Sequence, residues 1–316
     1  MSHVPHAVPP TLSVVIPTFN NEAILRRSIE SWRTHAADQP VELLVVEDGC
    51  RDGTQKFLED ASATDWGRRH LRWIHLDDAH ELRCTNAGFA AARGSLLAAW
   101  QDDMFLRAGW LVPELIRLFH RCPEIGLLGL SRGLNMYPVE EPIARWEDLL
   151  DWRRLQSTIG SFPWNWLRVQ EVDALVRPWV IRRECLERVG ALDEAFVPTE
   201  WDEADLAFRI RAAGWKVATC GYERLGAYHH LGSSTVGVLS DAYKARVLKN
   251  GRLFHERWDA EIRRTHARRR AAWTRPLSLA GWTATGVQAL RAVPRRLAHR
   301  WNERVRLHPV GSDPKN

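Results

Sequence analysis

The sequence has no run of 18 apolar residues, so we expect no membrane-spanning helix. Its five cysteines are scattered and never paired at the spacing of metal ligands, which favours a reducing compartment over a disulfide framework. The first ten residues contain neither a basic leader nor an apolar core, and we expect no signal peptide. These absences predict a cytoplasmic protein.

Charge is unevenly distributed along the 316 residues. The formal net charge is +5, but residues 261–308 contain 12 arginines and only 2 glutamates. The part of the chain before them must therefore be acidic, and the basic character belongs to the C-terminal segment.

Apolar runs of strand length alternate with helix-like segments over the first hundred residues. The expected strands are 11–20, 41–46, 71–76 and the run before Asp102, and the expected helices are 21–34, a segment through Phe57, and 82–92. Such alternation implies right-handed βαβ units and a mostly parallel sheet. The first part of the chain is thus predicted to be an α/β domain of the nucleotide-binding type.

Two adjacent carboxylates, Asp102 and Asp103, follow the fourth apolar run. Ligands of open α/β sheets collect beyond the carboxyl ends of the strands, so we expect both residues at the rim of a cleft. Their oxygens suit a hard divalent cation, which usually keeps positions free for phosphate oxygens. The alternative is an acidic pair that opens a loop and caps a helix starting near Ala108.

Four short motifs lie near the ends of the expected strands. They are Val15-Ile-Pro-Thr-Phe-Asn20, Val46-Glu-Asp-Gly-Cys-Arg-Asp-Gly-Thr54, Asn86-Ala-Gly-Phe-Ala-Ala-Ala-Arg-Gly94 and Gln101-Asp-Asp103. In this order they resemble the family-2 glycosyltransferases with the GT-A fold. The resemblance covers residues 11–240. It implies a Rossmann-like, mixed but mostly parallel sheet flanked by helices, with a nucleotide-binding half at 11–104 and an acceptor and base half at 105–240.

The resemblance also implies where the nucleotide base binds. Pro17 belongs to the strand end that holds the base, Phe19 resembles the aromatic residue that stacks on it, and Asp48 the carboxylate that accepts a hydrogen bond from it. A carboxylate can accept the imide N–H of uracil or thymine, which favours UDP or dTDP. The alternative is that Phe19 packs in the core and Asp48 caps the turn at Gly49.

The third motif departs from the family's pattern. Thr85 stands where relatives commonly have an arginine directly before Asn86. We place Arg83 and Asn86 among the donor-binding residues, with Arg83 supplying the charge for the diphosphate. The alternative is that Arg83 is a solvated surface residue.

The fourth motif departs as well, because the usual pattern is Asp-X-Asp. Gln101 takes the first place, where its amide could bond a ribose hydroxyl, and Asp102 takes the middle. Asp103 takes the last place and is the expected ligand of Mn²⁺ or Mg²⁺, which would neutralise charge on the departing diphosphate.

A helix expected to begin near residue 200 resembles the family segment that carries the catalytic base in its first turn. Its acidic pair is inverted, and by position Glu203 matches the usual base, with Asp202 as the alternative. The other interpretation is that both acids only complement the helix dipole. Asp205 lies four residues before Arg209 and is expected to form an intrahelical ion pair or support the site.

The segment Ala227–Thr235 resembles the histidine-containing loop that completes the metal or diphosphate site in many relatives. A neutral imidazole is a credible ligand for Mn²⁺ and less so for Mg²⁺. We prefer His229 over His230 as the second metal ligand beside Asp103.

Two segments match none of these motifs. Residues 131–171 suit an insertion over the acceptor side, in which Trp164 or Trp166 either stacks on an acceptor sugar or packs in the ordinary way. Residues 241–316 are expected to form a helical, arginine-rich extension. It suits an anionic membrane surface, with a solvated basic arm or an oligomer contact as alternatives. No recognition fold accompanies the charge, so we expect no nucleic-acid partner.

The sequence therefore predicts a cytoplasmic, peripherally membrane-associated glycosyltransferase that depends on a metal. It would transfer a sugar from a nucleotide diphosphate to a hydroxyl of a glycan or lipid-linked acceptor, and the resemblance implies inversion with one base. Two alternatives stay open. One is a nucleotidyltransferase, and the other is a catalytically degenerate scaffold in a membrane-associated glycan assembly complex.

Overall fold

The central sheet is built from the apolar runs of the sequence. In the computed structural model, residues 10–139, 142–149, 155–157, 168–232, 240–266 and 274–276 are described. The sheet has nine strands in the order β14-β9-β12-β6-β11-β4-β1-β2-β3. Only β9 and β11 run against the others within the described residues. The strands are β1 (Leu12–Thr18), β2 (Val41–Asp48), β3 (Leu71–Leu76), β4 (Leu96–Ala99), β6 (Ile125–Gly129), β9 (Arg168–Glu171), β11 (Trp179–Arg182), β12 (Lys216–Thr219) and β14 (Thr274–Pro276).

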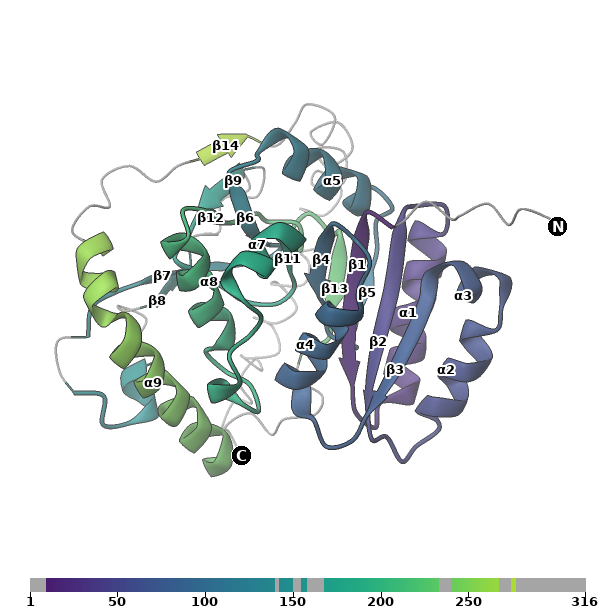
Figure 1. The fold of residues 1–316 in the computed structure, drawn as a ribbon, viewed down its shortest axis with the longest axis horizontal. Coiled ribbons are helices and arrows are strands. Elements are labelled where there is room, and N and C mark those ends of the chain that lie inside the picture. Colours follow the sequence, from purple (N-terminus) through teal and green to yellow (C-terminus); the bar gives the residue numbers. More distant parts are fainter. Residues whose placement is uncertain are drawn as a thin grey trace, which may run out of the picture.

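Helices cover both faces of this sheet (Figure 1). They are α1 (Glu22–Ala36), α2 (Thr54–Ser62), α3 (Asp65–His70), α4 (His80–Ala91), α5 (Leu111–Arg121), α7 (Arg183–Val189), α8 (Asp202–Ala212) and α9 (Asp241–His266). Because strand side chains alternate between faces, Val14 of β1 packs in the core with α1 and α5, whereas Val15 packs with α4, α7 and α8. Burial on both faces explains the uninterrupted apolar runs Val14–Pro17 in β1 and Leu43–Val46 in β2.

Helix α4 lies unusually close to the sheet. A Cβ atom at Gly88 would come within 2.2 Å of Val15 Cγ1, so the glycine of the third motif is needed for this approach. The first turn of α4 is thereby held at the edge of the sheet where β1 and β2 end.

Two smaller sheets complete the fold. A two-stranded ribbon joins β5 (Met104–Leu106), directly after the acidic pair, to β13 (Tyr228–His230). A second sheet has the order β10-β7-β8. Its strands are β7 (Gly133–Met136), β8 (Leu155–Ser157) and β10 (Ala174–Leu175), and the short helices η1 (Trp146–Leu149) and η2 (Glu194–Phe196) lie in the connections.

The expected βαβ units at 11–104 are present, and the sheet is mixed as predicted. Residues 172–183 form two strands, β10 and β11, with a break that contains Pro178, which has no N–H to donate. Helix α9 is the first part of the helical extension expected at 241–316, and it packs on α8.

Some expectations fall outside the described residues. They concern Trp164, Trp166 and almost all of the basic segment beyond residue 266. None of the helices in the described ranges combines the length and apolarity that crossing a bilayer requires.

Candidate active site

Several candidate residues meet at one edge of the sheet. Strands β1, β2 and β4 are parallel, so Phe19 after β1, Asp48 at the end of β2 and Gln101 after β4 lie at the same edge of the sheet. Strand β11 runs in the opposite direction, and its first residue, Trp179, pairs with Ala99 at the end of β4. Residues just before β11 therefore reach this edge too.

Phe19 is an exposed aromatic ring at the end of β1, directly after a buried strand. Its exposed fraction is 54%, which excludes the alternative that it packs in the core. Pro17 precedes it within β1 and pairs with Val46 of β2, which fixes the backbone that presents the ring. The arrangement offers a flat apolar surface at the edge where ligands collect.

Asp48 ends β2 and organises the start of α4. Its Oδ1 accepts a hydrogen bond from the backbone N–H of Ala79 at 2.6 Å, and its Oδ2 accepts one from His80 at 2.9 Å. The suggestion that Asp48 caps the turn at Gly49 is therefore wrong, because its oxygens bond to the next loop. Each carboxylate oxygen still has a second lone pair with which to accept a further donor.

Asp102 is tied to the end of β1 and the start of α1. Thr18 Oγ1 and Asn21 Nδ2 both donate to Asp102 Oδ2, at 2.8 and 3.0 Å. Burial raises the pKa of Asp102 to about 6, although these two hydrogen bonds act in the opposite direction. Gln101, directly before it, is half-buried at the same edge.

Asp103 is buried and lies beside a histidine of β13. The imidazole Nε2 of His230 is 3.4 Å from Asp103 Oδ1, and this contact raises the pKa of His230. The structure thus places His230, and not the preferred His229, beside Asp103. Successive side chains of a strand point to opposite sides, so when His230 faces Asp103 its neighbour cannot.

His229 lies on the other side of the β5–β13 ribbon. It stacks on Phe105, with ring centroids 6.4 Å apart, and both line an open groove of about 920 Å³ next to α1. Neither Asp103 nor Glu203 lines that groove. Burial, together with the nearby charge of Arg107, lowers the pKa of His229.

The side chains around Asp103 could supply only some of the ligands that a divalent cation needs. Among the described residues, no three His, Cys, Asp or Glu side chains come together in a group that could hold a metal. Asp103 and His230 offer two ligands, one carboxylate and one imidazole. Because cations at phosphate-transfer sites commonly use one or two protein ligands plus substrate phosphates, this pair fits a metal that arrives with the diphosphate.

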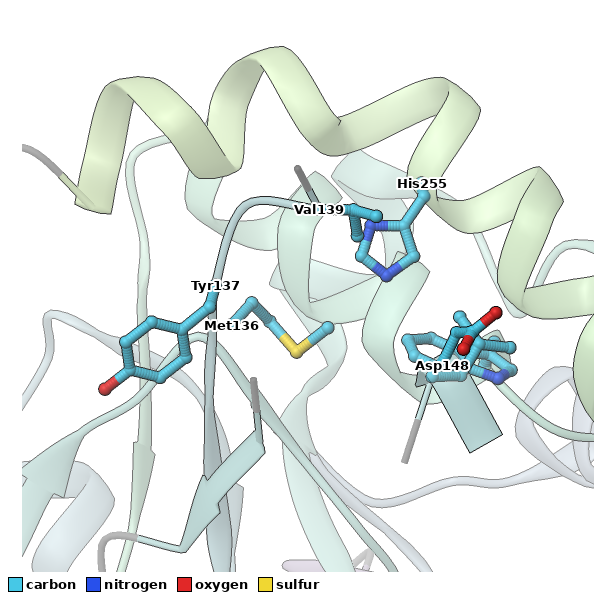
Figure 2. Close-up of a pocket in the computed structure, with 7 residues that line it drawn as sticks. Met136, Tyr137, Val139, Asp148 and His255 are labelled. Atoms are coloured by element: carbon cyan, nitrogen blue, oxygen red, sulfur yellow. The ribbon is translucent and has the colours of Figure 1, made fainter. Parts of the chain in front are cut away.

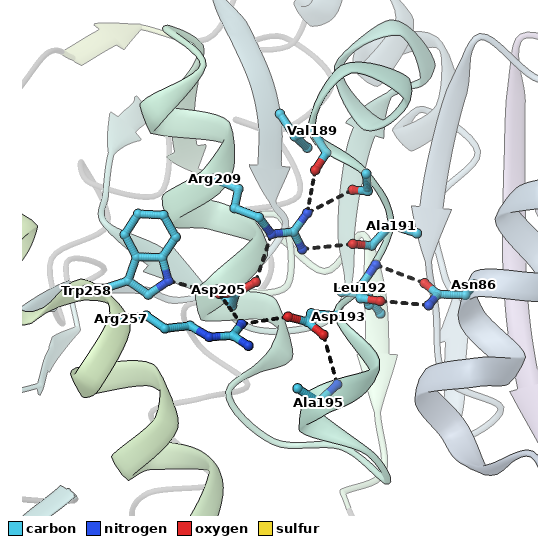
Figure 3. A network of polar contacts seen from close by, with 11 residues as sticks. Asn86, Val189, Ala191, Leu192, Asp193, Ala195, Asp205, Arg209, Arg257 and Trp258 are labelled. Atoms are coloured by element: carbon cyan, nitrogen blue, oxygen red, sulfur yellow. Dashed lines mark hydrogen bonds and ion pairs between the residues drawn. The ribbon is translucent and has the colours of Figure 1, made fainter.

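Arg83 and Asn86 of α4 have partners within the fold. Arg83 Nε lies 2.9 Å from Glu194 Oε2 in an exposed ion pair. The Asn86 amide donates to the carbonyl of Leu192 at 2.8 Å and accepts its N–H at 3.0 Å, as Figure 3 shows. Asn86 thus ties α4 to the segment after α7, a structural role that differs from the donor contact expected for it.

A buried arginine that we did not single out in the sequence lies at the centre of an acidic cluster. Arg177, just before β11, is 2.7 Å from Glu81 Oε1, 3.2 Å from Glu203 Oε1 and 3.5 Å from Asp202 Oδ2. Trp179 Nε1 also donates a hydrogen bond to Glu203 Oε1, at 3.0 Å. One guanidinium therefore faces three carboxylates from α4 and the first turn of α8.

The electrostatics of this cluster distinguish the two acids of α8. The Asp202 side chain is 2% exposed and that of Glu203 is 15% exposed. Burial raises the pKa of Glu203 to about 8, although Arg177 opposes the shift, and the charge of Asp202 adds to it. Burial likewise raises the pKa of Asp202. Of the two, Glu203 is the carboxylate that a hydroxyl group can approach.

Asp205, further along α8, has the structural role expected for it. It accepts Arg209 Nε at 2.8 Å, four residues on, and Trp258 Nε1 of α9 at 2.9 Å (Figure 3). Arg257 of α9 also contacts it at 3.4 Å. This network fixes α8 against α9 and against the segment after α7.

This arrangement can be compared with known proteins. The family model described as "Glycosyl transferase family 2" matches residues 13–190, more than half of the chain. The chain belongs to glycosyl transferase family 2. The match covers the four motifs, including Asp48, Asp102 and Asp103, and it ends before α8 and α9.

Curated relatives of this family-2 chain are distant. The "Uncharacterized protein y4gI" of Sinorhizobium fredii (strain NBRC 101917 / NGR234) is 24% identical over 79% of this chain and 28% of its own length. Validoxylamine A glucosyltransferase of Streptomyces hygroscopicus subsp. limoneus is 25% identical over 67% of this chain and 49% of its own. The chain thus spans only about a quarter to a half of these relatives.

Among solved structures, the crystal structure of GalNAc-T7 with UDP, GalNAc and Mn²⁺ is similar in fold. The TM-score is 0.56 at 14% identity, over 80% of this chain and 50% of that chain. The family match and this likeness confirm the GT-A fold that the motifs indicated.

Proposed function

We propose that this family-2 chain is a metal-dependent, inverting glycosyltransferase that moves a sugar from UDP or dTDP to a hydroxyl of a glycan or lipid-linked acceptor. The observation that carries the proposal is the environment of Glu203. This partly exposed carboxylate has a pKa of about 8 and lies at the sheet edge that also carries Asp103 and His230. A general base works best when its pKa is near the working pH.

For the donor, we assign the base to Phe19 and Asp48, the ring by stacking and the carboxylate by accepting the imide N–H. Gln101 is assigned to the ribose. Asp103 and His230 would hold Mn²⁺ or Mg²⁺, which when bound neutralises charge on the diphosphate. Asp102, held by Thr18 and Asn21, keeps the loop before β5 in place for these contacts.

In the transfer itself, the acceptor oxygen attacks the anomeric carbon as the bond from that carbon to the diphosphate oxygen breaks. The acceptor proton passes to the Glu203 carboxylate, and Arg177 and Trp179 hold Oε1 of that group in place. A single displacement needs no covalent intermediate and inverts the anomeric centre. Asp202 is too deeply buried for this role and is assigned to the positioning of Arg177.

The test is transfer from UDP-glucose and dTDP-glucose to a panel of methyl glycosides, with Mn²⁺, followed by proton NMR of the product. We expect a β-linked product from these α-linked donors. Glu203→Gln should lower the rate by about 10²- to 10⁴-fold, the usual contribution of a general base. An α-linked product, or an unchanged rate in Glu203→Gln, would overturn the mechanism.

A further inference from the structure

The two residues that precede the acidic pair of α8 have left-handed backbones. The φ angles are +84° at Glu200 and +68° at Trp201. Residues with a side chain rarely adopt this conformation, and they keep it only where the surrounding structure holds it. No side chain caps the start of α8. The direction in which α8 begins, and with it the place of Glu203, must therefore be set by contacts from elsewhere.

One side chain of α9 supplies three of those contacts, and the N–H of Leu82 in α4 adds one to Pro198 at 3.3 Å. Asn250 is fully buried, and its Nδ2 donates to the carbonyl oxygens of Phe196, Thr199 and Glu200, at 2.8, 2.9 and 3.1 Å. Three acceptors share the two hydrogens of one amide group, so the whole turn is gathered around it. The contact with Glu200 fixes the peptide group between the two left-handed residues.

Aromatic side chains next to Asn250 hold the turn from a second side. The Trp201 ring lies 5.1 Å from the ring of Phe254 and 5.6 Å from that of His255, measured between centroids. Figure 2 shows His255 projecting from α9 over a cavity that Trp201 also lines. That cavity has a volume of about 10 Å³, room for roughly one water molecule, so Trp201 has little space in which to move.

Contacts other than those of Asn250 also dock helix α9. A Cβ atom at Gly251 would come within 2.3 Å of Leu149 Cδ1, so the helix sits tightly against η1. Arg257 and Trp258 bind Asp205 of α8 through separate contacts. Loss of the Asn250 amide should therefore release the 196–201 turn while α9 stays docked.

We propose that Asn250 is a positioning residue for the transfer reaction, which holds the 196–201 turn so that Glu203 meets the acceptor hydroxyl. The inference rests on the proposed role of Glu203 as the base. It brings α9, which lies outside the residues matched by the family model, into the working active site.

The test measures the release of nucleoside diphosphate by Asn250→Ala as it transfers glucose from UDP-glucose or dTDP-glucose to a methyl glycoside acceptor. We expect kcat to fall by about 100-fold, the loss that a shift of about 1 Å in a reacting group can cause. The Kd of the nucleoside diphosphate with Mn²⁺ should stay within about twofold, because the residues assigned to the nucleotide and the metal lie at the ends of β1 and β2, next to β5 and in β13. Trp258→Phe is the matched control. It removes one hydrogen bond from α9 to α8 and should lower the unfolding temperature with kcat unchanged.

The decisive readout is the same substitution in the Glu203→Gln background. Because Asn250 acts through Glu203, Asn250→Ala should there cause no further loss. An equal loss in both backgrounds, or an unchanged kcat in Asn250→Ala alone, would overturn the role of Asn250. Full activity of Glu203→Gln by itself would instead overturn the proposed base. If Asn250→Ala does not fold, Asn250→Ser keeps one donor and should show a smaller loss with the same dependence on Glu203.

Discussion

His230 Nε2 lies 3.4 Å from Asp103 Oδ1, and this contact joins strand β13 to the acidic pair that precedes β5. The two residues are 127 positions apart in the sequence. They meet because β13 pairs with β5, the strand that directly follows the acidic pair, with His230 opposite Met104. The ribbon thus places an imidazole next to the carboxylate that we assign to the metal.

His230→Ala should weaken binding of Mn²⁺ in the presence of UDP by at least about tenfold, the lower end of what the loss of a partner at a metal site costs. The measurement is calorimetric titration with Mn²⁺. His229→Ala is the neighbouring control and should leave the affinity unchanged, because its ring faces the groove with Phe105. A larger loss in His229→Ala would contradict the assignment.

Phe19→Ala should weaken binding of the nucleoside diphosphate by about 1–3 kcal/mol, the usual worth of one base stacked on an aromatic ring. Its stability should change by no more than about 0.5 kcal/mol, because the ring is largely exposed. Calorimetry and thermal unfolding measure the two quantities. A stable variant with unchanged affinity would place the base elsewhere.

Arg177→Met should lower the free energy of unfolding by about 3–5 kcal/mol, since it leaves buried carboxylates without their cation. The matched control is Arg83→Met, which breaks an exposed pair with Glu194 and should cost about 0–1 kcal/mol. Denaturant unfolding at pH 8 compares the two. Equal losses would show that the cluster around Arg177 is not a buried ionic network.

The pH dependence of kcat/KM should carry the signature of Glu203. The base must be ionised, so the rate should rise with pH and level off above about 8, the pKa that burial gives to this group. A pH profile of kcat/KM in the free-enzyme regime measures it. A rate that is flat between pH 6 and 9 would contradict the assignment.

The same shift has a consequence for stability. The pKa of Glu203 is raised from 4.5 in the unfolded chain to about 8 in the fold, so folding takes up a proton between these values. Stability from this group is present below pH 4.5 and is lost as the pH rises through 8. Glu203→Gln should therefore gain stability relative to the parent chain across that window, as denaturant unfolding at pH 5 and pH 9 would measure.

The sequence predicts the first half of the fold well, because its signals are local. Strands β1, β2 and β4 each contain an apolar run, and β1, β2 and β3 are each followed by a helix. The positions of Phe19, Asp48 and Asp103 at strand ends follow from the same pattern. The intrahelical pair of Asp205 with Arg209 is predictable for the same reason.

The remaining parts of the site depend on contacts between distant segments. The choice between His229 and His230 requires the register of β13 against β5, and sequence spacing does not contain it. The cluster around Arg177 joins Glu81 to residues about a hundred positions later, and Asn86 finds its partner at Leu192. Arg177 lies in a mostly apolar stretch and Asn250 lies between Lys249 and Arg252 on a charged helix, and only their buried partners reveal their roles.

The proposed site at the sheet edge, with Asp48, Asp103 and His230, binds a nucleoside diphosphate together with a divalent metal. Its most direct test is calorimetric titration with UDP, dTDP, GDP and CDP, each with and without Mn²⁺, repeated on Asp103→Ala. We predict binding of UDP or dTDP that requires Mn²⁺ and is lost in the variant. Absence of binding to all four nucleotides, or binding that is indifferent to Mn²⁺ and to Asp103, would contradict the account and favour a catalytically degenerate scaffold.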